Sequence, residues 1–446
     1  MADSAPGRHS MALAEQEAVA FAADLIRIDT TNRGGGDCAE RPAAEYVAAR
    51  LADAGLDPVL LESAPGRANV VARFEGQDPA AGALLAHGHL DVVPAEPADW
   101  TRHPFSGEIA DGVLHGRGAV DMKNADATLL AAVRHMLRAG LRPRRDVVLA
   151  FTADEEDTAA YGAAWLVEQR PDLFDGCTEA IGESGAFTFH AGNGVRLYPV
   201  ASAERGTAWL KLTARGRAGH GSKANPDNAV AMIAGAVARI AAYQWPVRLI
   251  PAVRAAICAI AAAVGVEPGA LDDDATVAQA LGRIGPPAAL VRNTIRNSAN
   301  PTMLAAGYKV NVIPAEASAC VDGRVLPGRD AEFAAVLDEL TGPHVTWEYL
   351  HREIALEAPP DAPLVAAMTA ALLAEDPGGT VVPYCMGGGT DAKQFSRLGI
   401  AGYGFTPLWL QEGFDYYEMF HGVNERVPVA ALEFAVRVMS RFLAAA

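Results

Sequence analysis

The sequence predicts an α/β protein in which a mostly parallel sheet, with helices on both faces, is interrupted by a smaller α+β unit. Continuous apolar strand segments alternate with helical segments in the first part of the chain, which is typical of a sheet buried on both faces. Near residue 204 the strands change to alternating apolar and polar residues, as half-buried strands do. With 446 residues, half of them hydrophobic, the chain is long enough for two domains.

The elements of the larger domain follow from their apolar spacing. Helical spacing predicts helices over 11–29, 41–55, 125–140 and 159–169, and apolar runs predict strands over 83–93, 146–153 and 179–184. The same alternation is expected after the interruption, with strands over 344–350, 380–385 and 400–407 and helices over 363–376 and 428–446. We therefore assign residues 1–203 and 328–446 to one domain.

The inserted unit, residues 204–327, combines helices with strands that have one wet face. Residues 208–216 alternate in polarity, a helix follows Pro226 and Asp227, a long Ala-rich region is helical, and residues 307–314 and 317–327 alternate again. One-sided strands together with helices are typical of an α+β arrangement.

Charge and composition exclude several classes of function. Lys plus Arg number 37 and Asp plus Glu 54, and the net charge of −17 argues against nucleic acid or an anionic membrane as partner. The longest uncharged apolar run, near residues 255–266, is too short to cross a bilayer, and the N-terminus does not resemble a secretory signal. Five scattered cysteines without C-x-x-C spacing indicate a reducing, cytoplasmic compartment. A small-molecule substrate is the expected partner.

Acidic and imidazole side chains fall at the ends of four predicted strands, where ligands of open α/β sheets gather. They are His89 with Asp91, then Asp121, then Glu155 with Glu156, and then Glu183. Carboxylate oxygen and imidazole nitrogen are ligands of Zn²⁺, and the absence of cysteine ligands favours a catalytic over a structural zinc. Each motif alone is more often structural. The prediction of a zinc site therefore rests on the recurrence of such side chains at the ends of four predicted strands. His87, by contrast, is interpreted as a core histidine.

The ordered motifs of the chain resemble a known family. HGHLDVVP, GRGAVDMKN, TADEED, AIGESG, AGHGS, DGRVLP, GGGTDA and HGVNERV occur in the order typical of the co-catalytic zinc amidohydrolases and peptidases that include aminoacylase, glutamate carboxypeptidase and succinyl-diaminopimelate desuccinylase. The resemblance runs from about residue 15 to the C-terminus. Within the family, HLDVVPAEPADWTRHPFSGEI is most similar to the carboxypeptidase S-like dipeptidases.

The resemblance implies a zinc exopeptidase-like catalytic domain that holds two Zn²⁺ ions per chain, with Co²⁺ or Mn²⁺ as substitutes. His89 and Glu183 would ligate one ion, Glu156 and His421 the other, and Asp121 would bridge the two. A cis peptide bond between Asp121 and Met122 is also implied.

Two further acids receive roles beside the metal ions. Neighbouring side chains on extended backbone point to opposite sides, so Glu156 can ligate a metal while Glu155 faces the bridging water as its general base. Asp91 would accept the imidazole N–H of His89 and fix the tautomer of that ligand.

The same resemblance assigns substrate contacts, most of them in the inserted unit. His220 would donate to the oxyanion, reaching across a homodimer formed by the inserted lid or dimerisation domain. Arg324 resembles the arginine that grips the substrate carboxylate, for which a planar fork is suited. Asn311 would contact the substrate, as would the backbone near Gly388 and Thr390, whose glycine-rich loop lacks the spacing of a phosphate-binding motif.

The expected activity is zinc-dependent hydrolysis of an amide or peptide bond adjacent to a free carboxylate. The protein would act as a dipeptidase, a carboxypeptidase or an N-acyl-amino-acid deacylase. Two alternatives remain open on the sequence alone: a metal-free binding protein on the same fold, and an aminopeptidase that requires a free amine.

Overall fold

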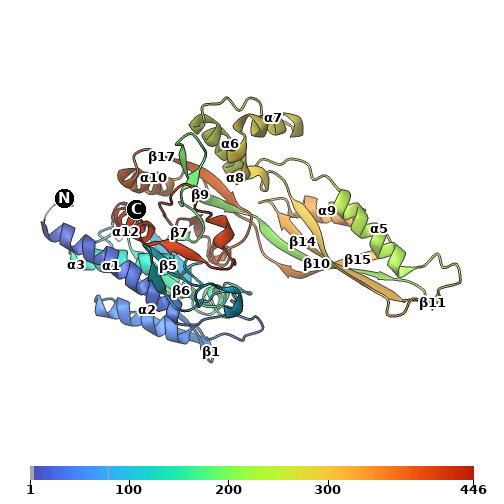
Figure 1. Cartoon of the computed structure of the whole chain (residues 1–446), viewed down its shortest axis with the longest axis horizontal. Coiled ribbons are helices and arrows are strands. Elements are labelled where there is room, and N and C mark those ends of the chain that lie inside the picture. The colour runs from blue at the N-terminus through green and yellow to red at the C-terminus, as the bar shows by residue number, and fades with distance from the viewer. Residues whose placement is uncertain (1–4, 79) are drawn as a thin grey trace. The chain divides into compact units, whose positions relative to one another are not determined.

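The computed structural model describes residues 5–78 and 80–446 (Figure 1). Within this part of the chain, two compact units are present. Unit 1 comprises the described residues of Met1–Ser202, Ala358–Pro383 and Thr390–Ala446, and unit 2 comprises Ala203–Glu357 and Tyr384–Gly389. No helix of the described residues is long and apolar enough to span a bilayer.

The sheet of unit 1 has parallel strands at its centre. The strand order is β1-β2-β6-β3-β7-β18-β9, with β8 and β17 also paired to β9. The strands are β1 (Val59–Ala64), β2 (Arg67–Phe74), β3 (Ala83–His89), β6 (Val147–Thr152), β7 (Cys177–Gly182), β8 (Phe189–His190), β9 (Arg196–Glu204), β17 (Gly379–Met386) and β18 (Ala401–Gly404). Because β6, β3, β7 and β18 run parallel, their carboxyl ends meet at one edge of the sheet.

Helices cover both faces of this sheet. They are α1 (Ala5–Arg27), α2 (Arg41–Asp53), α3 (Lys123–Arg138), α4 (Ala163–Gln169), α10 (Pro363–Glu375), α11 (Ala392–Phe395) and α12 (Val429–Ala445). Helices α1, α3 and α12 lie together (Figure 1), and their core includes Leu84 of β3. The next residue, Leu85, packs on the opposite face with Leu166 of α4 and Phe395 of α11. Burial of successive strand residues on opposite faces confirms the predicted fold class.

Smaller elements complete unit 1. Strands β4 (Glu108–Ala110), β5 (Val113–His115) and β19 (Arg426–Pro428) form a separate small sheet. Short 3-10 turns occur at η1 (Pro97–Asp99), η2 (Pro171–Phe174), η4 (Ser396–Leu398) and η5 (Tyr417–Met419).

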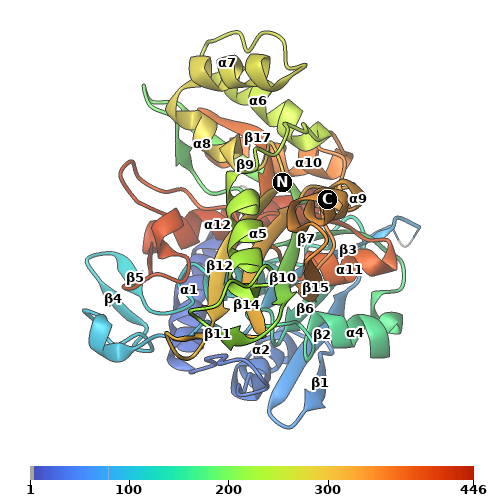
Figure 2. The same ribbon diagram turned by 90° about the vertical axis from the view of Figure 1, so that its right-hand side faces the viewer.

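Unit 2 is built on an antiparallel sheet with the order β12-β14-β10-β15. Its strands are β10 (Gly206–Arg215), β12 (Ser298–Ala306), β14 (Glu316–Val325) and β15 (Val345–Arg352), with short β11 (Gly219–His220), β13 (Val312–Ile313) and β16 (Leu356–Glu357). Its helices are α5 (Ala229–Ala242), α6 (Pro251–Ala263), α7 (Asp274–Ile284), α8 (Ala289–Arg292) and α9 (Asp330–Thr341), with η3 (Pro286–Ala288). Helix α5 packs against the sheet through Ile233 (Figure 2).

Unit 2 is longer than the sequence predicts. The larger domain was expected to resume at residue 328, but β15 pairs with β10 along its length, and Phe333 and Leu337 of α9 pack in the core of unit 2. That boundary is therefore wrong, and unit 1 resumes at Ala358. Residues 345–352 alternate between less and more exposed, as an antiparallel strand with one wet face does, and the alternation of Val345, Trp347 and Tyr349 with Thr346 and Glu348 shows this period in the sequence.

The chain leaves unit 1 and returns to it at neighbouring points. The backbone N–H of Ala358 donates to the carbonyl oxygen of Ser202 at 2.7 Å. Both residues belong to unit 1, so the two ends that flank the insertion are hydrogen-bonded to each other.

Candidate metal centre

Two histidines of unit 1 share one carboxylate. Nε2 of His89 lies 3.1 Å from Oδ1 of Asp121, and Nε2 of His421 lies 3.4 Å from Oδ2 of the same residue. His421 Nε2 is also 3.1 Å from Oε2 of Glu156. Residues that are far apart in the sequence thus meet around Asp121, whose two oxygens face different imidazoles.

Two more carboxylates approach His89. Its Nε2 lies 3.7 Å from Oε2 of Glu183 and 3.9 Å from Oε2 of Glu155. Two sets of side chains offer donor atoms that lie within 4.8 Å of one another: His89, Asp121 and Glu156, and His89, Glu155 and Glu183. The structure therefore brings together the five predicted ligands and the predicted base. It places His89 in both sets, whereas the resemblance implies that His89 belongs to one ion only.

Parallel strands deliver most of these side chains to one edge. Strand β3 ends at His89, β7 ends one residue before Glu183, and β6 ends shortly before Glu155. Asp121 is different, because it precedes helix α3 and follows a loop instead of a strand. The predicted strand-end placement of Asp121 is wrong. Its position is set by the loop that precedes α3 and not by a strand.

The backbone around the cluster adopts uncommon conformations. Asp154, Ser184 and His421 have φ values of 65°, 65° and 55°, in the left-handed region that residues other than glycine rarely occupy. Two of these residues are direct neighbours of Glu155 and Glu183. Such conformations gather at functional sites, where they aim the adjacent side chains. The implied cis peptide bond between Asp121 and Met122 is present.

Asp91 acts differently from its predicted role. Nδ1 of His89 lies 3.0 Å from the backbone carbonyl oxygen of Asp91 and 3.6 Å from the Asp91 carboxylate, so the carbonyl is the acceptor. The carboxylate instead accepts the backbone N–H groups of Glu155 and Glu156, both at 3.1 Å, and the side-chain amide of Asn32 at 2.9 Å. Asp91 thus fixes the turn that carries both glutamates.

The cluster carries an excess of negative charge. Burial, reinforced by the charges of neighbouring carboxylates, raises the pKa of Glu183 to about 8 and the pKa of Glu155 well above its ordinary value. Hydrogen bonds to Asp121 and Glu156 raise the pKa of His421 to about 10. Each shift reduces the net negative charge, which a divalent cation would balance more effectively.

The donor atoms present fit a divalent metal ion. Oε1 of Glu156 is buried and has no hydrogen-bond partner among the described residues. A buried oxygen without a partner is costly unless it binds a cation. Mixed imidazole and carboxylate donors without thiolates suit zinc, manganese or cobalt in a catalytic site.

The substrate residues assigned to unit 2 lie in two regions of it. His220 is exposed in β11, with Nδ1 2.8 Å from the hydroxyl of Ser222. The pairing of β11 with β13 brings the adjacent turn alongside, where the carbonyl of Asn311 accepts the N–H of Gly221 at 2.9 Å. Arg324 lies on β14 and forms a two-point ion pair with Asp322 at 2.9 and 3.2 Å.

The glycine-rich segment divides between the two units. Gly388 belongs to unit 2 and is half-buried, and a Cβ added there would meet nothing within 4 Å. Thr390 belongs to unit 1, is buried, and accepts the N–H of Ala392 at its hydroxyl. His87 is buried and packs against Phe395, as expected for a core histidine.

Three residues that the sequence analysis did not single out support the centre. They are Asn32, Asp391 and Glu425. Asp391 accepts the hydroxyl hydrogen of Thr152 at 2.5 Å, and burial raises its pKa to about 7. Asp391 and Glu425 stand in the motifs GGGTDA and HGVNERV, so their motifs were recognised but not their roles. Asn32 lies outside every motif, and no local signal marked it.

The fold and the carboxylate–imidazole cluster define a metal-dependent hydrolase with a dinuclear site. Residues 85–445 match the model of Peptidase family M20/M25/M40, and the chain belongs to this family.

Known proteins resemble the chain over nearly its full length. Aminoacylase-1A of Rattus norvegicus is 27% identical over 424 residues, which cover 92% of each chain. The metallo-carboxypeptidase Sso-CP2 of Sulfolobus solfataricus matches with a TM-score of 0.70 and 19% identity, over 96% of this chain and 98% of that one. The di-peptidase Dug1p of Saccharomyces cerevisiae matches with a TM-score of 0.69 and 17% identity, over 98% and 97%. These structural matches show a shared fold.

Proposed function

We propose that the protein is a di-zinc hydrolase that cleaves an amide bond adjacent to a free carboxylate. The observation that carries this proposal is the position of Asp121, whose two oxygens face His89 and His421 separately. A carboxylate placed in this way is suited to bridge two cations. The substrate class agrees with the names of the three relatives, an aminoacylase, a carboxypeptidase and a di-peptidase.

Each ion would have its own terminal ligands. His89 and Glu183 would hold one, Glu156 and His421 the other, and Asp121 both. Bound zinc would supply Lewis-acid polarisation of the scissile carbonyl and a lower pKa for the attacking water.

Glu155 is the proposed general base. Its Oε2 lies 3.9 Å from Nε2 of His89, and its backbone N–H donates to the Asp91 carboxylate. It would take a proton from the attacking water as the new C–O bond forms. It would then give that proton to the amine nitrogen as the C–N bond breaks, so that carboxylic acid and amine are the products.

Substrate contacts are assigned to Arg324, Asn311, Gly388 and Thr390. Arg324 would bind the free carboxylate by its planar fork, in exchange for its ion pair with Asp322. The oxyanion donor would be His220, which is exposed as such a role requires.

A second copy of this chain is the proposed partner, bound through unit 2. Strand β12 is an edge of its sheet, and Met303 and Leu304 on it are 67% and 58% exposed. Exposed edge strands with apolar side chains favour pairing with another chain. All five cysteines are unpaired, which supports a reducing, cytoplasmic location.

A hydrolysis panel tests the function. Dipeptides, N-acyl amino acids, N-blocked dipeptides and C-terminal amides are assayed in Zn²⁺, Co²⁺ and Mn²⁺, and the metal content of the purified protein is measured. We expect about two zinc ions per chain and preference for free acids over amides. Metal-free protein without activity would instead identify a binding protein. Activity confined to substrates with a free amine would identify an aminopeptidase.

A further inference from the structure

Glu425 is a fully buried carboxylate that neither the ligand set nor the base assignment includes. Its Oε1 accepts the backbone N–H groups of Val120 at 2.6 Å and Asp121 at 3.0 Å. Its Oε2 accepts the N–H of Gly118 at 3.0 Å and a guanidinium N–H of Arg117 at 2.7 Å. Four donors from one loop thus converge on this carboxylate.

The loop is shaped around the Glu425 carboxylate. Gly118 has a φ of 89°, and a Cβ at this position would lie 2.9 Å from the side chain of Lys123. In turns of this kind successive N–H groups point inward and form a concave site for an anion. Since Asp121 has no strand to place it, the Glu425 carboxylate fixes the backbone from which the Asp121 side chain projects.

The same ion pair reaches the segment that carries His421. Glu425 lies in that segment, and Nη2 of Arg117 is 3.5 Å from the carbonyl oxygen of His421 and 3.4 Å from that of Pro94. The guanidinium also lies over the ring of Trp100, at 5.1 Å. The Arg117–Glu425 pair therefore contacts both the loop that presents Asp121 and the segment that presents His421.

We propose that Glu425 is a positioning residue that holds the Asp121 carboxylate between His89 and His421 and thereby sets the affinity for the metal pair. Charge-assisted hydrogen bonds to a carboxylate are short and strong, so they restrain the loop more than neutral ones would. The metal part of this inference rests on the proposed function, whereas the restraint of the loop does not.

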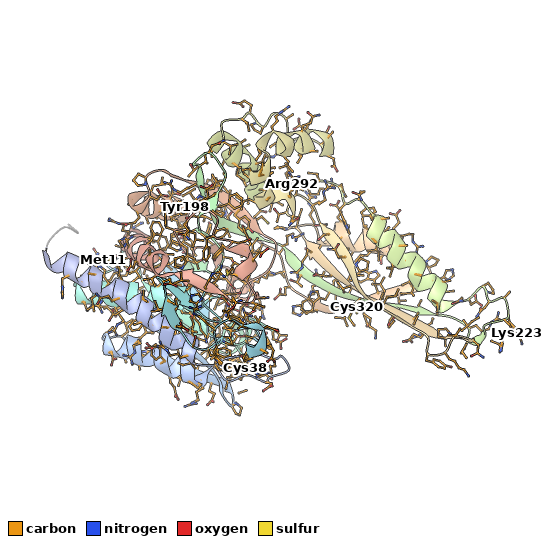
Figure 3. All side chains as sticks on the ribbon, in the orientation of Figure 1. Met11, Cys38, Tyr198, Lys223, Arg292 and Cys320 are labelled. Atoms are coloured by element: carbon orange, nitrogen blue, oxygen red, sulfur yellow. The ribbon has the colours of Figure 1, made fainter. Side chains whose placement is uncertain are left out.

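Glu425→Gln tests the proposal with little change in volume. One carboxylate oxygen becomes an amide NH₂ group, which cannot accept the N–H bonds that the oxygen accepted. Asp376→Asn is the matched control, because Asp376 also accepts from four donors, on Arg196, Tyr198 and Gly378, and none of them belongs to the metal centre. Tyr198 is labelled in Figure 3.

Two readouts are needed, and neither is activity. Hydrogen exchange of residues 116–122 in the metal-free protein measures how well the backbone amides of the loop are protected. Competition with a chromogenic chelator measures the affinity for zinc. We expect Glu425→Gln to lose protection in that peptide and to bind zinc about 10–100-fold more weakly, as for other residues that orient metal ligands. Asp376→Asn should leave both unchanged, even if it unfolds more easily.

Defined results would overturn the inference. Wild-type protection of residues 116–122 in Glu425→Gln would show that Glu425 does not order the loop. Lost protection with wild-type zinc affinity would show that the loop is ordered for another purpose. If Glu425→Gln does not fold, Glu425→Asp keeps the charge but withdraws it by one methylene, and the same two outcomes apply. A wild-type protein that binds no zinc but shows Glu425-dependent protection would overturn the proposed function and the metal part of this inference, and would support the restraint of the loop.

Discussion

At the residue scale, Glu155 and Glu156 show how adjacent identical side chains can receive different chemistry. Both backbone N–H groups donate to one carboxylate, that of Asp91, so the same group restrains the backbone of both residues. The side chains then diverge, because Glu156 meets His421 at 3.1 Å while Glu155 approaches His89 at 3.9 Å. Geometry, not residue type, separates the proposed ligand from the proposed base.

Replacement of each glutamate by glutamine separates the two roles. Glu155→Gln should keep both metal ions but lose about 10²–10⁴-fold in kcat, since the attacking water loses its proton acceptor. Glu156→Gln should lose one metal ion, because an amide oxygen carries no charge. Exposed Asp157→Asn is the control in the same turn. Metal analysis and kcat measured together check this, and two retained metals with wild-type kcat in both variants would refute the assignment.

Arg324→Lys addresses carboxylate recognition. Lysine keeps the charge but cannot form a two-point contact, so KM for N-acyl amino acids should rise with little change in kcat. KM for C-terminal amides should not change. Arg215→Lys, an exposed arginine paired with Glu316 in the same sheet, should behave as wild type. Equal parent activity on acids and amides would remove Arg324 from the site.

Individual residues were predictable where a motif named them, and this explains why supporting residues were missed. Each proposed ligand stands in a recognisable sequence pattern. Asn32 and Asp391 act through contacts with Asp91 and Thr152, which lie far away in the chain. Only the folded structure places such partners together, so local patterns could not reveal them.

At the element scale, helix α3 begins at Lys123, two residues after the proposed metal ligand Asp121. Its first residue, Lys123, is fully buried and donates from Nζ to the carbonyl oxygens of Leu25 at 2.9 Å and Ile28 at 2.8 Å. These carbonyls lie at the C-terminal end of α1, where a cation adds a favourable interaction with the last carbonyl groups of the helix. Lys123 therefore joins the start of one helix to the end of another.

Lys123→Met should weaken this junction. Methionine fills a similar volume but removes the ammonium donor from both carbonyl oxygens, although that of Leu25 still accepts the backbone N–H of Ile28, so the free energy of unfolding should fall by about 1–3 kcal/mol. Lys223→Met, at an exposed lysine labelled in Figure 3, should cost nothing measurable. Urea unfolding with matched metal content measures both. Equal stability of the two variants would contradict a capping role for Lys123.

Helices and strands were predictable where the spacing of apolar residues within one short segment marked them. Which strands pair with one another was not predictable. The strands β3, β6 and β7 lie close to their expected residues because each contains a run of consecutive apolar residues. Strand β15 was found but placed in the wrong unit, because its pairing with β10 joins distant parts of the chain. Of the expected strand over 307–314, only β13 formed.

At the scale of the whole molecule, the buried acids link stability to metal and pH. Glu183 has a folded-state pKa of about 8 against an ordinary value of 4.5, so between these values the metal-free folded state holds a proton that the unfolded chain releases. Stability of the metal-free protein should therefore fall as pH rises from about 4.5 to about 8. Bound zinc should raise stability and flatten this slope. Thermal unfolding with and without chelator across this range measures both, and identical curves would contradict a metal site.

Subunit mixing tests the proposed assembly. If His220 acts in the partner's site, His220→Ala and Glu155→Gln are each inactive alone. After subunit exchange, half of the dimers are mixed and each has one intact site, so activity should return to about a quarter of wild type. A second Glu155→Gln preparation in place of His220→Ala is the control and should restore nothing. An active monomer without recovery on mixing would confine His220 to its own chain.

The adjacent chain ends at Ser202 and Ala358 have a consequence for how such a protein can diverge. Because these ends are hydrogen-bonded to each other, the segment between them can be lengthened, shortened or replaced without displacing the strands β3, β6 and β7, at whose ends His89, Glu156 and Glu183 lie. The proposed metal ligands and the proposed substrate residues Arg324 and His220 are therefore encoded in different stretches of the gene. If Arg324 and His220 have the substrate roles proposed for them, mutations there can change the substrate without a change in the residues of the metal centre.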